Sequence, residues 1–146
     1  MRDGAGYLSA GHAGQIVALD DSGNVVPLAH LAVSVRALAV VGDNIYCGDT
    51  DGMLHRITRS GERLNAFSAH RAAITGLAIL ADGCLASCGE DGAVRVWCGD
   101  VCFETAAAGD FVTSVAEGRA GGLVCASYDG GIYRLPLRRA VRPMSE

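Results

Sequence analysis

The stretch that decides the fold is ITGLAILADGCLASCGEDGAVRVW, residues 74–97. It contains three short apolar segments, which are separated by turns at Asp82-Gly83 and Asp91-Gly92. An Asp-Gly pair suits a tight hairpin because glycine, which has no Cβ, accepts a positive φ. Short segments that are rich in β-branched residues and bounded by turn residues predict strands. Residues 74–97 therefore predict three strands in succession.

The second of these turns recurs along the chain at a nearly constant interval. Gly92 lies in EDGAVRVW, Gly52 in TDGMLHRI and Gly130 in YDGGIYRL, and a weaker copy places Gly14 in HAGQIVAL. The steps between these glycines are 38, 40 and 38 residues. Self-similarity at a period near 40 is the sequence signature of a WD-type β-propeller. A repeat of this kind predicts a scaffold that presents loops for binding, and not an active site.

Three full repeats can be superposed, at residues 24–57, 62–97 and 101–135, and each offers an outer strand followed by three more. Before them, YLSAG and QIVAL supply two inner strands of an earlier blade. The expected fold is all-β: a partial WD-type β-propeller of about three four-stranded blades plus two strands of an earlier blade. We expect it to span residues 1–137, with a flexible basic tail at 138–146. On this pattern the chain begins within a blade and ends where a propeller would close.

The middle repeat holds a polar set that WD-repeat blades use internally, namely His70, Ser87, Asp91 and Trp97. Asp91 can accept a hydrogen bond from the imidazole, the imidazole contacts the Ser87 hydroxyl, and that hydroxyl can accept from the indole N–H. Each buried polar group then has a partner, as an apolar blade requires. The other repeats keep only part of the set: His30, Cys47, Asp51 and Ile57 in the first, and Ala108, Cys125, Asp129 and Leu135 in the third.

A serine, a histidine and an aspartate could also form a hydrolase triad. The sequence has no GxSxG elbow, and Ser87 lies within a strand, where it should be covered. We therefore interpret the set as structural and expect no enzyme activity and no cofactor.

Composition and charge narrow the class of protein. Half of the 146 residues are apolar, which excludes a disordered chain. A net charge of −4 argues against a nucleic-acid surface, and no apolar run reaches the roughly 18 residues that would span a membrane. The N-terminal stretch lacks the apolar core of a signal peptide, so the expected location is the cytoplasm or the nucleus.

The six cysteines do not have the spacing of a metal site. Cys84 and Cys88 are separated by three residues, as are Cys98 and Cys102, and no CxxC pair occurs. Cys47 and Cys125 fall in the same repeat column as Ser87, where small residues fit. We expect reduced, buried thiols and no metal.

The order of the repeats resembles the end of the propeller in the phospholipase A-2-activating protein family of WD-repeat, ubiquitin-binding proteins. The resemblance rests on VRALAV, on ITGLAIL forty residues later, on EDGAVRVWCGDVCFET and on GGLVCASYDGGIYRL, within residues 35–135. It implies a propeller that binds ubiquitin on one face and acts in ubiquitin-dependent protein degradation. The family also implies early blades and later segregase-recruiting domains, which this sequence does not contain.

The contact face for a protein partner should consist of the loops that join the second and third strands and the loops that precede the first strand. Phe111 and Tyr128 are the expected hot spots, because exposed aromatic side chains offer large area at low entropic cost. For each residue, the alternative is that it only caps a blade. The candidate partner-binding residues are His12, Asp49, Thr50, Arg71, Glu90, Asp110, Phe111 and Tyr128.

A second hypothesis is a truncated propeller fragment that acts only as part of a larger or oligomeric assembly. A partial propeller leaves two sheet faces uncovered, and uncovered apolar faces favour self-association.

Overall fold

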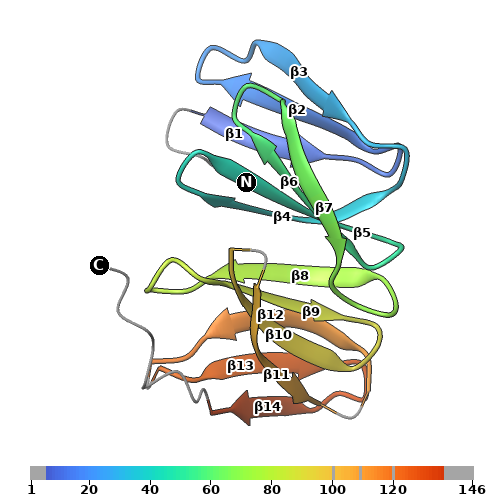
Figure 1. Ribbon diagram of the computed structural model, residues 1–146, viewed down its shortest axis with the longest axis vertical. Helices are drawn as coiled ribbons and strands as arrows, with labels where there is room; N and C mark the ends of the chain where they lie inside the picture. The colour runs from blue at the N-terminus through green and yellow to red at the C-terminus, as the bar shows by residue number, and fades with distance from the viewer. Residues whose placement is uncertain (1–5, 100, 109, 120, 137–146) are drawn as a thin grey trace.

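The structure, a computed structural model, describes residues 6–99, 101–108, 110–119 and 121–136. The described residues form fourteen strands and no helix. Four antiparallel sheets follow one another along the long axis of the molecule (Figure 1). The expected tail at 138–146 lies outside the described residues.

The two end sheets have three strands each and the two central sheets have four. The first sheet contains β1 (Gly6–Ala10), β2 (Gln15–Asp20) and β3 (Val25–His30), and the last contains β12 (Val112–Glu117), β13 (Leu123–Ser127) and β14 (Ile132–Leu135). The second contains β4 (Val35–Val41), β5 (Asn44–Asp49), β6 (Met53–Thr58) and β7 (Arg63–Ser68), and the third contains β8 (Ile74–Ile79), β9 (Leu85–Gly89), β10 (Ala93–Cys98) and β11 (Val101–Ala107).

The partial propeller expected from the sequence is therefore confirmed, with its strands grouped differently. The outer strand that opens each sequence repeat pairs with the sheet before it, so a repeat is offset from a sheet by one strand. Short hairpins cause this offset. In the link from β2 to β3, for example, Asp20 Oδ1 accepts hydrogen bonds from the backbone N–H groups of Ser22 and Asn24, each at 2.9 Å.

The hydrophobic core consists of three layers, one between each pair of neighbouring sheets. Ile16 packs with Ile45 in the first layer. Leu54 packs with Leu85 in the second. Val94 packs with Leu123 in the third. Alternating side chains of each central sheet thus contact the sheet before and the sheet after.

The turn glycines are needed where one blade meets the connection to the next. Gly52 has a φ of +84°, and a Cβ at this position would lie 2.2 Å from the carbonyl oxygen of His70. The carbonyl of Gly52 also accepts hydrogen bonds from the backbone N–H groups of Ala69 and His70, at 2.9 and 3.0 Å. The recurring glycine thus serves both the hairpin and the close approach of the next inner strand.

Each inner strand of the last three sheets begins with a β-bulge. The register shifts lie between Val35 and Ala37 in β4, between Ile74 and Gly76 in β8, and between Val112 and Ser114 in β12. A bulge changes the direction of a side chain at the end of a strand. The three bulges position Arg36, Thr75 and Thr113 in one cleft, which is described below.

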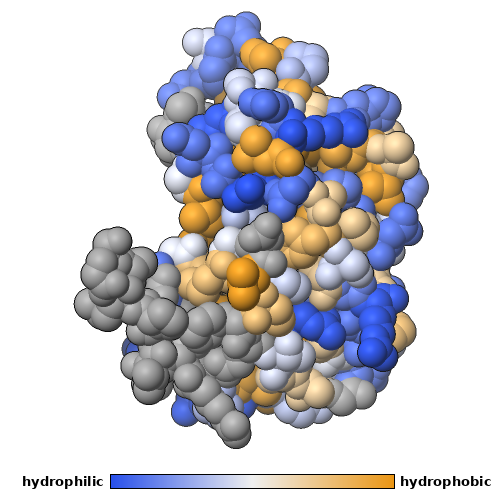
Figure 2. Space-filling view, in the orientation of Figure 1, coloured by the Kyte–Doolittle hydropathy of each residue, from blue (hydrophilic) through white to orange (hydrophobic). Residues whose placement is uncertain are grey.

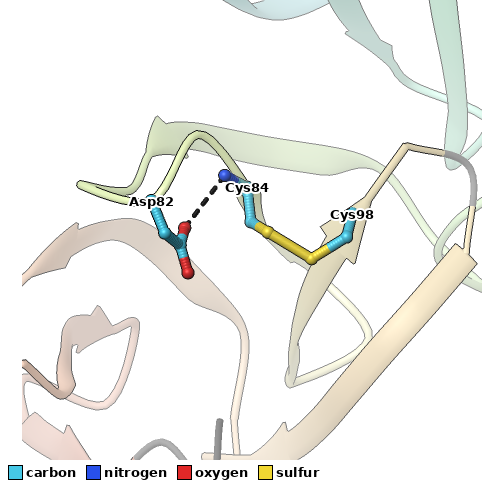
Figure 3. Close-up of a disulfide and its surroundings, with 3 residues drawn as sticks. All are labelled: Asp82, Cys84 and Cys98. Atoms are coloured by element: carbon cyan, nitrogen blue, oxygen red, sulfur yellow. Dashed lines mark hydrogen bonds between the residues drawn. A yellow bond between two sulfur atoms is a disulfide. The ribbon is translucent and has the colours of Figure 1, made fainter. Parts of the chain in front are cut away.

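One expectation about the cysteines is wrong. Cys84 and Cys98 form a disulfide, with their Cα atoms 4.8 Å apart (Figure 3). The register of the β9–β10 hairpin explains this pairing, because Leu85 lies opposite Trp97. Cys84, just before Leu85, therefore lies beside Cys98, just after Trp97. The 13 intervening residues hide that proximity in the sequence.

The other expectation about the cysteines is confirmed for three of them. Cys47, Cys88 and Cys125 are buried and outside the disulfide, whereas Cys102 is exposed. Burial raises the pKa of the Cys47 thiol to about 12 and that of Cys88 to about 11. These thiols stay protonated at neutral pH and fill space between the sheets.

Candidate functional site

The polar set of the middle repeat forms one continuous network. His70 Nδ1 lies 2.9 Å from Asp91 Oδ1, and His70 Nε2 lies 2.7 Å from Ser87 Oγ. Trp97 Nε1 donates to the same Ser87 oxygen at 2.9 Å. Asp91 also accepts hydrogen bonds from the backbone N–H groups of Arg71 and Ala93, at 3.0 and 3.1 Å. The network joins β9, β10 and the segment before β8.

Burial and hydrogen bonding together set the protonation state of this network. Burial lowers the pKa of His70, against the opposing effect of Asp91. For Asp91, burial raises the pKa, but hydrogen bonds from Arg71, His70 and Ala93 together place it well below its ordinary value. A neutral His70 then donates from Nδ1 to Asp91 and accepts at Nε2 from the Ser87 hydroxyl. Ser87 is completely buried, so no substrate reaches it, and the arrangement holds the blade together.

A related pair of side chains occurs in each of the last three sheets. The third residue after the turn glycine is His55, Arg95 or Tyr133, and each bonds to a carboxylate of the same loop. His55 Nε2 lies 2.6 Å from Asp49 Oδ2, Arg95 Nη1 lies 3.1 Å from Asp91 Oδ2, and Tyr133 Oη donates to Asp129 Oδ2 at 2.8 Å. Three different donors thus hold the same turn.

This pairing corrects the role expected for Asp49. Asp49 is buried, and besides His55 it accepts hydrogen bonds from the backbone N–H groups of Asp51 and Met53, at 2.8 and 2.9 Å. Its carboxylate is therefore not available to a partner. In this repeat Asp49 does what Asp91 does in the next one, although Asp51 occupies the equivalent position in the sequence.

Four of the predicted contact residues occupy one repeat position. His12, Thr50, Glu90 and Tyr128 each lie two residues before a turn glycine. In three of them the backbone N–H donates to the loop that precedes the inner strand: Thr50 to Ser34, Glu90 to Ala73 and Tyr128 to Phe111, at 3.1, 2.9 and 2.7 Å. The scaffold thus fixes the backbone in the same way while the side chains differ in chemistry. We call these four residues the loop row.

A cleft of about 460 Å³ lies next to the last two residues of the loop row. Phe111 and Tyr128 form one wall, with their ring centroids 6.2 Å apart. Both rings are accessible, since Phe111 is 48% exposed and Tyr128 is 76% exposed. The structure thus brings three predicted residues into one site. The complete lining is Arg36, Thr75, Glu90, Phe111, Val112, Thr113 and Tyr128.

An ion pair also lines the cleft. Arg36 Nη1 lies 3.1 Å from Glu90 Oε1, and both side chains are partly exposed. Sequence reasoning missed Arg36, Thr75 and Thr113, because a bulge in an inner strand has no marked signal in the repeat. Thr75 Oγ1 donates to the carbonyl of Val112 and so joins the third sheet to the fourth.

The remaining candidates lie elsewhere. His12 Nδ1 lies 3.2 Å from Ser34 Oγ, so His12 and Thr50 meet at Ser34 between the first two sheets. Arg71 is exposed beside the polar network and lines a separate hollow with Arg95 and other residues. Asp110 accepts a hydrogen bond from the backbone N–H of Phe111 at 2.7 Å and therefore orients that aromatic residue.

Two features are absent from the described part of the chain. No group of three or more histidine, cysteine, aspartate or glutamate side chains is placed to hold a metal ion. No helix is long and apolar enough to cross a membrane.

Comparison with known proteins identifies the architecture. Residues 61–98 match the family model described as WD domain, G-beta repeat. This fold is that of a WD40 propeller. The solved WD40 β-propeller domain of Doa1 superposes with a TM-score of 0.81 at 22% identity, covering 94% of this chain and 48% of that one. The computationally designed Ika4 protein superposes with a TM-score of 0.80 at 20% identity, covering 93% of this chain and 88% of that one.

The chain spans about half the length of the Doa1 structure that it matches. No curated protein matches its sequence. The WD40 repeat found by the family model is the one that contains the complete polar network, and its neighbours keep the blade geometry with other donors. In this fold the cleft lies where the first residues of β4, β8 and β12 meet the loops that hold Glu90, Phe111 and Tyr128.

Proposed function

We propose that the chain is a protein-binding scaffold and that its partner docks in the cleft walled by Phe111 and Tyr128. The observation that carries this proposal is the aromatic pair, which is exposed although each backbone is held in place. Tyr128 N–H donates to the Phe111 carbonyl, and Phe111 N–H donates to Asp110. A rigid aromatic pair loses little entropy on binding, which is the property of an interface hot spot.

The surroundings of the aromatic pair supply a polar rim. Arg36 and Glu90 lie at one side, and the hydroxyl of Thr113 is bonded at 3.1 Å to the carbonyl of Ala126. An apolar centre bordered by charged side chains is the usual anatomy of a protein interface. A partner that fits this site presents a small apolar patch with a carboxylate or a cation beside it.

Ubiquitin is the partner that we propose. The suggestion comes from the resemblance of residues 35–135 to the phospholipase A-2-activating protein family, and the fold shared with the Doa1 domain is compatible with it. On this proposal the chain takes part in ubiquitin-dependent protein degradation in the cytoplasm or the nucleus. We assign it no catalytic step, because WD40 propellers generally serve as interaction scaffolds.

Isothermal titration of the 146-residue chain with ubiquitin tests the proposal. The double substitution Phe111→Ala and Tyr128→Ala should weaken binding at least tenfold, the effect of one or two hot-spot residues. Val101→Ala is the matched control, because Val101 is an exposed apolar residue on the outer strand β11. Equal affinities for the wild type and the double variant, or the absence of any heat of binding for the wild type, would rule out this role of the cleft.

A further inference from the structure

The side chains that join neighbouring sheets follow one pattern at all three interfaces. The second residue after a turn glycine contacts the sheet that follows: Ile16, Leu54 and Val94 occupy this position in the first three sheets. Each packs in a layer with the residue at one equivalent position of the next sheet, which is Ile45, Leu85 and Leu123 respectively. We call the side of a sheet that contacts the next sheet its forward face, and the side that contacts the previous sheet its backward face. At every interface a forward face therefore packs on a backward face.

The two end sheets carry both halves of a fourth such interface. In the last sheet the forward position is Ile132, which is 77% exposed, whereas Ile16, Leu54 and Val94 are at most 1% exposed. In the first sheet the backward position is Tyr7, which is 49% exposed, whereas Ile45, Leu85 and Leu123 are at most 3% exposed. The pairings Ala126↔Ile132 and Tyr7↔Leu19 place both residues in the same register as their buried equivalents.

These end faces lie at opposite ends of the row of sheets (Figure 1). The side of the molecule seen in Figure 2 mixes hydrophobic and hydrophilic residues. The two faces do not cover each other within the described residues, since Tyr7 and Ile132 are both exposed. They can meet between two molecules.

We propose that a second copy of this chain covers both end faces, so that two copies form a closed ring of eight sheets. Ile132 of each copy then packs against Tyr7 and Leu19 of the other, as Leu54 packs with Leu85 and Trp97 inside one copy. The contact is head-to-tail, and such contacts give rings when the rotation closes. Eight blades is within the range that propellers form. This inference is independent of the proposed partner, because Tyr7, Leu19 and Ile132 do not line the cleft.

Sedimentation velocity of the 146-residue chain tests whether two copies form this ring. The wild type should sediment as a dimer, with a mass of twice the 15.0 kDa of one chain. Ile132→Asp and Tyr7→Asp should each give monomers, because either change places a carboxylate in both interfaces of the ring. Val101→Asp is the control and should leave the dimer intact, since Val101 lies on an outer strand of a central sheet. Circular dichroism should show that all three variants remain folded, as expected for exposed positions.

A mixture of the two variants distinguishes head-to-tail pairing from pairing of identical faces. In a 1:1 mixture, the intact forward face of the Tyr7→Asp chain meets the intact backward face of the Ile132→Asp chain, and both aspartates fall in the other interface. Mixed dimers joined by the one intact interface should therefore form. If identical forward faces paired instead, Tyr7→Asp alone would remain dimeric. That result, a monomeric wild type, or assemblies larger than two copies would each overturn the proposal.

Discussion

His70 Nε2 lies 2.7 Å from Ser87 Oγ, and the two side chains meet in the interior of the third sheet. Both side chains are buried, so the hydrogen bonds they make within the network are not replaced by water. This pair belongs to the network with Asp91 and Trp97 that joins β9, β10 and the segment before β8. Through the backbone N–H groups of Arg71 and Ala93, Asp91 also ties that segment to the β9–β10 turn.

Removing the Ser87 hydroxyl should destabilise the chain. In Ser87→Ala, both His70 and the Trp97 indole lose a buried partner, which should lower the free energy of unfolding by about 1–3 kcal/mol. Urea denaturation followed by tryptophan fluorescence measures the change. Ser68→Ala, at an exposed position of β7, is the control and should stay within about 0.5 kcal/mol. Equal stabilities of the two variants would mean that the network contributes nothing.

Stability should fall on mild acidification because of His70. Its pKa in the folded chain is below the ordinary 6.5, so between those values the unfolded chain binds the proton and the folded chain does not. The contribution is complete above pH 6.5 and is lost as the pH falls below it, by no more than about 1.4 kcal/mol per pH unit. Asp91 has the same sign at lower pH, because its depressed pKa gives stability that is lost below the ordinary 3.8.

Urea denaturation at pH 7.5 and pH 5.5 measures this dependence. His70→Gln should be less stable at pH 7.5 than the wild type, and its loss of stability on going to pH 5.5 should be smaller. A variant with the same pH slope as the wild type would show that another group is responsible.

The buried Asp49 should matter more than the exposed Asp51, contrary to their positions in the repeat. Asp49→Ala removes the partner of His55 and of two backbone N–H groups and should cost about 1–3 kcal/mol. Asp51→Ala is the matched control two residues away and should change stability by less than about 0.5 kcal/mol. Thermal unfolding of the two variants side by side gives the comparison, and the reverse order would refute the assignment.

The disulfide predicts a definite number of reactive thiols. Under denaturing, non-reducing conditions, a thiol reagent should titrate the four cysteines outside the bond, and all six after reduction. Cys98→Ser should lower stability by about 3 kcal/mol, the cost of opening a loop of this length. Cys102→Ser, at an exposed thiol, is the control and should have little effect. Six reactive thiols before reduction would contradict the bond.

The regular part of this fold could be predicted from the sequence, because the turn glycines repeat at nearly equal steps. The loop row followed from the same spacing, since Glu90 and Tyr128 are placed by their distance from a turn glycine. The contacts that could not be predicted depend on the register between strands, that is, on which residues of two paired strands lie opposite each other. Asp49 replaces Asp51 in the turn because His55 reaches it from the next strand.

The residues added to the cleft were hidden for the same reason. Arg36 and Glu90 are 54 residues apart in the sequence. They meet because a bulge at the start of β4 changes the direction of the Arg36 side chain. Cys84 and Cys98 meet only in the final register of β9 and β10. Local patterns predict where strands begin and turn, whereas contacts between strands emerge from packing.

The central claim, that the chain binds a protein partner at the cleft, is tested most directly by NMR. Titrating the ¹⁵N-labelled chain with unlabelled ubiquitin should shift the amide resonances of Glu90, Phe111 and Tyr128 most strongly. The amides of the outer strands β3 and β7 should move little. Unchanged spectra, or shifts confined to residues away from the cleft, would contradict the account.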